Sequence, residues 1–265
     1  LVPSSLDRIE ECHWHLHQME HWFHFAEPFR YSLNCFLRTI KEVPQLVQME
    51  LQNHDGFPDW YRPKRRALHE DKLLADLFDS RDAIVHRRML IPGSSGFFGI
   101  TRGKGLKLGV GIPINPMSDS DLAMCQLATM AKAEGDFMGF FSPHDEDTAP
   151  CIQRTWRLPS FPDDDLVDLA ASAHQKVATL VIEAVTFVGG APPELDLKCP
   201  HGSERVRIKV YDRQKLAEFV YGGASQAGTG PLSPAALEEA SAESESKKSG
   251  GPEQPGCSEP PANER

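Results

Sequence analysis

Apolar residues recur at helical spacing through the first 90 residues. An apolar stripe between residues 5 and 53 predicts two helices, or one long helix that Pro28 interrupts and Pro44 kinks. Its members are Leu33, Phe36, Leu37, Ile40, Val43, Leu46 and Val47. After turn-forming residues at 53–58, a second helical region is expected from about Trp60 until the pattern ends near residue 90.

Beyond residue 90 the pattern changes to short strands. Residues 97–101 and 106–112 predict a β-hairpin that follows a glycine-rich break at 92–96, and residues 151–158 and 205–211 predict two more strands. Short helices are expected at 119–132 and 214–221. The clearest helix spans 163–188, with aspartates at its start, a continuous apolar face and two glycines after its end.

These elements predict an α+β fold that is mainly α. Residues 5–90 would form the first part of a helical bundle, and residues 161–221 would add its closing helix plus a short strand and helix. Residues 91–160 would be a β-rich insert with a small antiparallel sheet. Residues 222–265 are dominated by Gly, Ser, Pro, Ala and Glu, and we expect them to be disordered.

Composition and charge bear on the cellular compartment of the protein and on its possible partners. The sequence shows neither a transmembrane run nor a signal peptide, and its six cysteines are scattered without a Cys-x-x-Cys pair, which favours free thiols in the cytoplasm. The formal net charge is −10, but the last 43 residues alone carry seven acidic and three basic residues. The acidic total is therefore only a weak argument against a nucleic-acid partner.

A candidate catalytic pattern lies in the second helical region. On a helix, Asp82 and His86 share one face, where a carboxylate orients an imidazole and raises its basicity. Arg81 adds a planar cation that suits a phosphate. An Arg, a polar residue, three apolar residues and a His resemble the Arg-x4-6-His signature of the HEPN family. Residues 27–51 are also similar to the first long helix of HEPN domains.

The resemblance implies a HEPN-like helical bundle and a metal-independent endoribonuclease of the toxin or defence kind. Arg81 would hold the scissile phosphate, Asp82 would orient, and His86 would move protons without any metal or cofactor. The active site would form at a homodimer interface, with RNA as substrate and an antitoxin or another protein as a further partner. This chain carries Asp where the commoner motif has Asn, which adds negative charge beside the phosphate.

Basic residues near the motif are candidate RNA contacts. They are Arg87 and Arg88 after the motif, and Arg62, Lys64, Arg65 and Arg66 earlier in the same helical region. The alternative for the second group is a solvated helix face. The alternative for the motif is a surface ion pair of Arg81 or Arg87 with a nearby aspartate. The whole bundle would then serve dimerisation or the binding of RNA or protein without catalysis.

A histidine stripe near the N-terminus offers a different chemistry. His13, His17 and His21 recur every fourth residue, so a helix would present them on one side to a zinc ion. His17, Glu20 and His21 also match the His-x-x-Glu-His pattern of inverzincin proteases. Interleaved aromatic residues favour a packing surface instead. Later candidates are weaker: Cys199 and His201 lack a partner pair, and His174 is interpreted as a surface residue.

Overall fold

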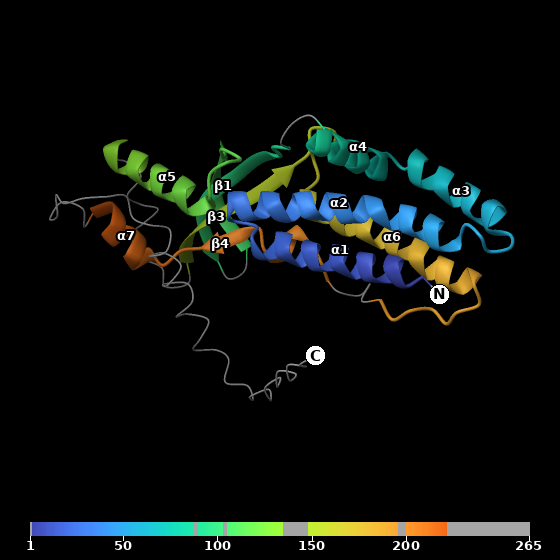
Figure 1. Cartoon of the computed structure of the whole chain (residues 1–265). Helices are drawn as coiled ribbons and strands as arrows, with labels where there is room; N and C mark the ends of the chain where they lie inside the picture. The colour runs from blue at the N-terminus through green and yellow to red at the C-terminus, as the bar shows by residue number, and fades with distance from the viewer. Residues whose placement is uncertain (1, 87–89, 103–104, 135–147, 196–199, 222–265) are drawn as a thin grey trace, which may run out of the picture. The chain divides into compact units, whose positions relative to one another are not determined.

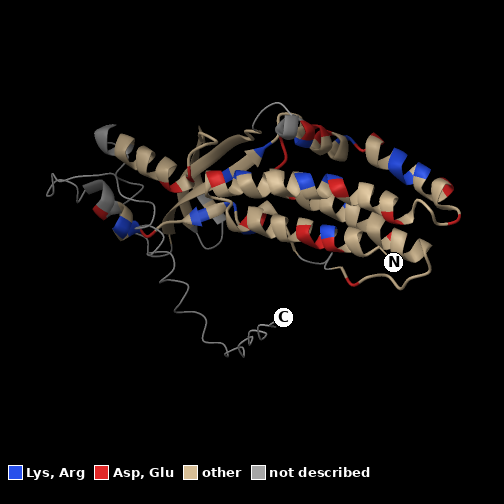
Figure 2. Ribbon diagram, in the orientation of Figure 1, with Lys and Arg blue, Asp and Glu red and all other residues tan. Residues whose placement is uncertain are grey.

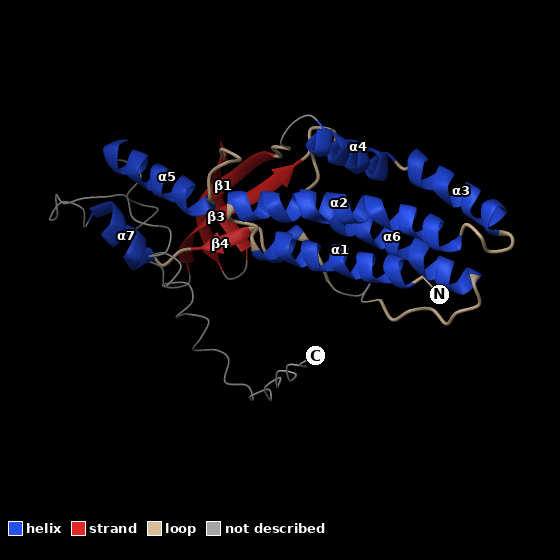
Figure 3. Ribbon diagram, in the orientation of Figure 1, coloured by secondary structure: helices blue, strands red, loops and turns tan. Residues whose placement is uncertain are grey.

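The computed structural model describes residues 2–86, 90–102, 105–134, 148–195 and 200–221 (Figure 1). The fold is α+β and mainly helical, as predicted, with helices and a four-stranded antiparallel sheet (Figure 3). Contacts divide the chain at Gly222–Gly223. The disorder predicted for residues 222–265 falls outside the described residues.

Two long helices form the N-terminal part of the bundle. Helix α1 spans Pro3–His21 and helix α2 spans Ala26–Leu51, so of the two predicted alternatives the structure has two helices, not one kinked helix. Pro28 lies in the first turn of α2, where a missing backbone N–H costs nothing, so the interruption comes before it at residues 22–25. Pro44 lies inside α2, and its carbonyl accepts a hydrogen bond of 2.7 Å from the buried Tyr61 hydroxyl.

The second helical region is two helices. Helix α3 spans Phe57–Glu70 and helix α4 spans Lys72–His86, and they are separated at Asp71. The backbone of Asp71 is extended, with φ −71° and ψ 113°, and its side chain accepts a 3.0 Å hydrogen bond from the Leu74 N–H. Asp71 therefore ends one helix and caps the next. The apolar pattern does not show this interruption because both helices pack against the same core.

Helix α6, Leu166–Phe187, closes the bundle against α1 and α2. Asp165 caps it by accepting a 2.9 Å hydrogen bond from the Val167 N–H. The same carboxylate accepts a 3.0 Å hydrogen bond from the Trp156 N–H, so the cap also fixes the helix to a strand. Burial raises the pKa of Asp165 to about 6 despite these two hydrogen bonds.

The sheet has the strand order β2-β1-β3-β4. Strands β1 (Gly93–Arg102) and β2 (Gly105–Pro113) form the predicted hairpin, β3 spans Thr148–Arg157, and β4 (Ile208–Val210) pairs with β3 as predicted. The predicted break at 92–96 is wrong, because β1 already begins at Gly93. A Cβ on Gly96 would lie 2.4 Å from the carbonyl oxygen of Gln153, so the glycine permits close pairing there.

Strand β3 connects two cores through side chains on one face. Ile152 belongs to a small core with Phe98, Met124 and Leu216, under helices α5 (Ser120–Glu134) and α7 (Arg213–Tyr221). Trp156 belongs to the bundle core, where it stacks on Phe29 with ring centroids 4.5 Å apart and donates to the Phe23 carbonyl. The bundle and the sheet are therefore one packed unit.

Candidate metal centre

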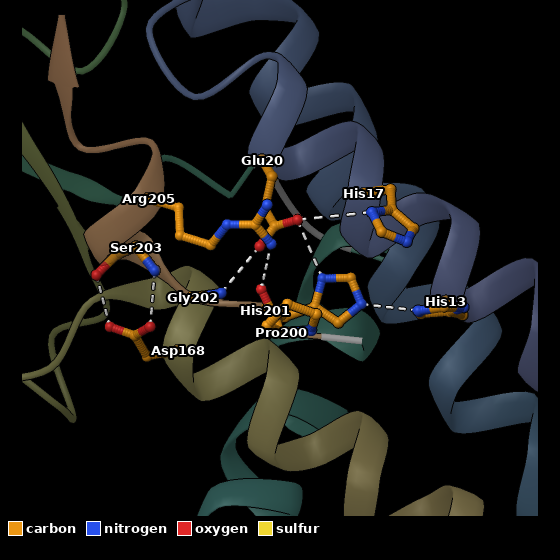
Figure 4. Close-up of polar contacts among 9 residues, drawn as sticks. All are labelled: His13, His17, Glu20, Asp168, Pro200, His201, Gly202, Ser203 and Arg205. Carbon is orange, nitrogen blue, oxygen red and sulfur yellow. Dashed lines mark hydrogen bonds and ion pairs between the residues drawn. The ribbon is translucent and has the colours of Figure 1, made fainter. Parts of the chain in front are cut away.

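Three imidazole rings meet beside the bundle. His13 and His17 lie on α1, and His201 lies in the segment that precedes the short 3₁₀ turn Ser203–Arg205 (Figure 4). One nitrogen from each ring lies within 4.8 Å of the other two. The His13 Nε2 and His201 Nε2 atoms are 2.7 Å apart. Residues about 190 positions apart in the sequence therefore present nitrogen donors to one point.

The buried stripe of α1 explains where its polar residues point. Cys12, Leu16 and Met19 face the core, and His13, His17 and Glu20 each follow one of them by a single position. One position rotates a side chain by about 100° around a helix, so these polar residues border the buried face. The side chain of Glu20 is 11% exposed, whereas that of His17 is 44% exposed.

Hydrogen bonds from two helices fix the segment that carries His201. The Ser203 N–H and hydroxyl donate to the two carboxylate oxygens of Asp168, on α6, at 2.8 and 2.7 Å. The Gly202 N–H donates to Glu20 Oε1 at 2.8 Å. Gly202 has φ 158° and ψ 150°, a conformation that glycine almost alone adopts. The chain can therefore turn its N–H toward Glu20 and still place His201 against α1.

Glu20 orients the cluster. Its Oε2 atom lies 3.0 Å from His201 Nδ1 and 3.6 Å from His17 Nδ1. Burial acts to raise the pKa of Glu20, but the hydrogen bonds from His201 and Gly202 outweigh it, so the pKa lies below its ordinary value. An ionised Glu20 can only accept, so His201 Nδ1–H donates to it, and the Nε2 atom of His201, which faces His13, carries the lone pair.

His174 completes the surroundings of the cluster. The prediction that it lies on the surface is wrong: His174 is 6% exposed, and its ring stacks on His13 with centroids 5.3 Å apart. Burial lowers its pKa to about 4, and the neighbouring His13 adds to the effect. His174 is thus an uncharged residue that borders the cluster. It was not recognised in the sequence because it interrupts an otherwise apolar helix face without any repeat.

The predicted stripe of His13, His17 and His21 is only partly a cluster. His13 and His17 do lie together, but His21 is the last residue of α1 and packs on Trp22, with ring centroids 4.4 Å apart. His201 supplies the third nitrogen instead. The interpretation that the Cys199–His201 segment lacks a partner is wrong for His201, whose partners are on α1. The position of Cys199 falls outside the described residues.

The geometry around Arg81 and Asp82 matches the ion-pair alternative. Arg81 Nη1 lies 3.2 Å from Asp82 Oδ1, and Lys41 Nζ, on α2, lies 2.6 Å from Asp82 Oδ2. The hydrogen bond from Lys41, followed by that from Arg81, lowers the pKa of Asp82. The side chain of His86 and the residues Arg87 and Arg88 fall outside the described part. The ribonuclease activity stays a prediction, which RNA cleavage in excess chelator would test.

The earlier basic residues lie on α3, among acidic neighbours (Figure 2). Ion pairs join Arg62 to Asp59 at 3.8 Å, Lys64 to Glu183 at 2.7 Å, and Arg66 to Glu70 at 2.7 Å. Arg65, from the same group, is exposed. This face of α3 thus has the mixed charge of a solvated helix, and its role as an RNA contact stays a prediction.

Fold and site together define an α+β protein with a three-histidine centre at the edge of a helical bundle. The family model described as bacteriophage lambda protein ea47 matches residues 3–90, which include His13, His17 and Glu20. The resemblance to the HEPN family is therefore wrong, because the matching family over the same helices is a different one. No curated protein and no solved structure matches the chain. Across the described helices, none combines the length and apolar character that spanning a membrane requires.

Proposed function

We propose that this protein binds a divalent transition metal through His13, His17 and His201, with zinc as the best chemical match. The observation that carries the proposal is the meeting of three imidazole nitrogens within 4.8 Å. Imidazole suits zinc and its neighbours in the transition series, whereas calcium and magnesium prefer oxygen. A helix surface with scattered histidines would not bring in a third one from a distant segment.

The spacing of the nitrogens supports a metal after a small adjustment. Two imidazoles on a tetrahedral zinc ion place their nitrogens about 3.4 Å apart. His13 Nε2 and His201 Nε2 are 2.7 Å apart, the distance of a shared hydrogen. A metal would replace that hydrogen, and the rings would separate by roughly 0.7 Å. His13 and His17 would make such a shift by rotation of their side chains on α1.

The contacts behind the rings also support a metal. Ligand histidines in metal sites commonly donate their second N–H to a carboxylate, which fixes the tautomer and increases the basicity of the ligand nitrogen. Glu20 stands in this relation to His201 at 3.0 Å. Asp168 in turn holds Ser203, two residues beyond His201. The ligand, its orienting carboxylate and the anchor of its segment therefore form a continuous network.

A bound metal would join the segment after residue 200 to α1. A ligand present at 100 times its dissociation constant stabilises the folded state by about 2.7 kcal/mol. We therefore expect zinc to raise the unfolding temperature of the protein, since two ligands are on α1 and the third is on a segment that continues into β4. Metal binding would thus stabilise the contact between the bundle and the C-terminal strand.

The test is a zinc titration of the full chain against a chromophoric chelator, with elemental analysis of the loaded protein. We expect one zinc per chain, and a loss of at least 100-fold in affinity for His201→Ala. His69→Ala is the matched control, because His69 is an exposed histidine on α3. Equal zinc affinity in the wild type and in His201→Ala would overturn the proposal. A thermal scan of the same samples checks that the variant folds.

A further inference from the structure

In the part of the chain that the structure describes, the cluster offers three donors to a metal. Among the described residues, the group able to share one metal consists of His13, His17 and His201. Glu20 uses one oxygen for His201 and the other for the Gly202 N–H. Both oxygens of Asp168 accept hydrogen bonds from Ser203. Both nearby carboxylates therefore take part in positioning the His201 segment.

The cluster is closed on one side and open on another. The side chain of His201 is 7% exposed and that of Glu20 is 11% exposed, so the protein largely covers the cluster on the side of the 200–205 segment. His174 covers the far side of His13. The side chain of His17 is 44% exposed. A molecule from solution would therefore approach a bound metal from the side of His17, whose ring is labelled beside His13 and His201 in Figure 4.

The charge of the loaded site would select the kind of molecule. Three neutral imidazoles leave the full charge of a divalent ion, and the ionised Glu20 cancels only half of it. Structural zinc sites are usually closed by four protein ligands, whereas sites with three protein ligands keep a position for water or substrate. A positive centre of low exposure favours an anion at that position over a neutral donor.

Resting on the proposed metal binding, we infer that the metal keeps one coordination position, facing the His17 side, for an anionic oxygen or nitrogen donor. The ligand class is a small anion, such as a carboxylate or an inorganic phosphate. Azide is the corresponding spectroscopic probe. This inference makes the site a binding centre for an external ligand, in addition to a structural link between two segments.

The test uses the full chain loaded with Co²⁺, whose visible absorption reports the number and type of ligands. We expect saturable changes in the visible bands on titration with azide, and competition by acetate and phosphate. His69→Ala, loaded in the same way, should give the same titration. The spectrum before azide should show nitrogen and oxygen ligands without the charge-transfer band of a thiolate.

Two results would overturn the inference and leave the proposed function intact. One is a cobalt spectrum that azide, acetate and phosphate leave unchanged. The other is a thiolate charge-transfer band, which would show that a cysteine closes the site. Failure of Co²⁺ and Zn²⁺ to bind at all would overturn the metal-binding proposal itself, so the two failures are distinguishable.

Discussion

His24 and His201 connect the N-terminal helices to the same C-terminal segment, but they use their ring nitrogens differently. His24 Nε2 lies 2.8 Å from the Val206 carbonyl, and Nδ1 lies 2.8 Å from the Ser120 hydroxyl. Because a carbonyl can only accept, Nε2 carries the hydrogen and Nδ1 accepts from Ser120. His201 instead faces a carboxylate with Nδ1 and another imidazole with Nε2.

The difference separates a structural histidine from a candidate ligand. Both nitrogens of His24 are satisfied by neutral groups of the fold, so no lone pair is left for a metal. The Nε2 atom of His201 instead shares a hydrogen with His13, so a metal at this point would replace a hydrogen bond between two imidazoles. The group that each ring nitrogen faces therefore indicates better than the number of nearby histidines whether a histidine can bind a metal.

The largest expected effect is the loss of stability at low pH that results from the burial of His24. Burial lowers the pKa of His24 from 6.5 to about 3, and Lys209 and Arg154 act in the same direction. His24 therefore takes up a proton near pH 6.5 in the unfolded chain but only near pH 3 in the folded protein. Neutral His24 makes its full contribution to the unfolding free energy above pH 6.5. This contribution is lost as the pH falls, by at most about 1.4 kcal/mol per pH unit.

Denaturant unfolding at a series of pH values in excess chelator would measure this loss. His24→Asn should flatten the acid slope, whereas the exposed control His69→Asn should keep the slope of the wild type. His174 contributes a loss of the same sign in all three proteins, so the difference between slopes isolates His24. Parallel curves for the wild type and His24→Asn would contradict the role of His24.

Gly202→Ala, a substitution next to His201, should destabilise the protein. The conformation at Gly202 is strained for alanine, and an added Cβ would lie 3.2 Å from Asp168 Oδ1. We expect a loss of about 1–3 kcal/mol in unfolding free energy, together with weaker zinc binding. Gly189→Ala is the control, because Gly189 has φ 77° but open space around it. It should cost about 1 kcal/mol and leave zinc affinity unchanged.

Glu20→Gln should weaken zinc binding by about 10- to 100-fold, since removing an orienting carboxylate usually has this cost. Glu50→Gln is the matched control. The Glu50 carboxylate also accepts hydrogen bonds, from the Ser4 and Ser5 N–H groups at 2.7 and 3.1 Å, but Glu50 is on α2 and contacts the N-terminal end of α1, whereas Glu20 is at its C-terminal end. Chelator competition should show wild-type zinc affinity for Glu50→Gln. Unchanged affinity in Glu20→Gln would mean that the carboxylate does not orient His201.

Most of the fold was predictable because its elements have strong periodic patterns. The apolar faces of α2 and α6 repeat over many turns, and the strands alternate clearly, so the mixed, mainly helical class followed. The interruption at Asp71 and the early start of β1 were not predictable from that pattern. Asp71 acts through one local cap, and Gly96 through the close approach of Gln153, which only the paired strand reveals.

The residues of the site were predictable from the sequence, but their meeting was not. The spacing of His13 and His17 predicts a shared helix side, and the sequence offers His201 as a soft ligand. Their meeting depends on contacts between residues 181 or more positions apart, such as Glu20 with His201 and Gly202. A pattern along the chain does not contain that pairing. For the same reason the sequence favours Arg81, Asp82 and His86 as a site, because their spacing is entirely local.

The smallest expected effect tests that local pattern. The side chain of Asp82 is 47% exposed and pairs with Lys41 and Arg81, and exposed ion pairs usually contribute about 0–1 kcal/mol. Asp82→Asn should therefore change the unfolding free energy by less than about 1 kcal/mol and leave zinc affinity unchanged. Lys41→Met, which removes the other partner, should have an effect of similar size in denaturant unfolding. A loss of zinc affinity in Asp82→Asn would show that the two regions are coupled, whereas the separate networks around Glu20 and Lys41 require them to act independently.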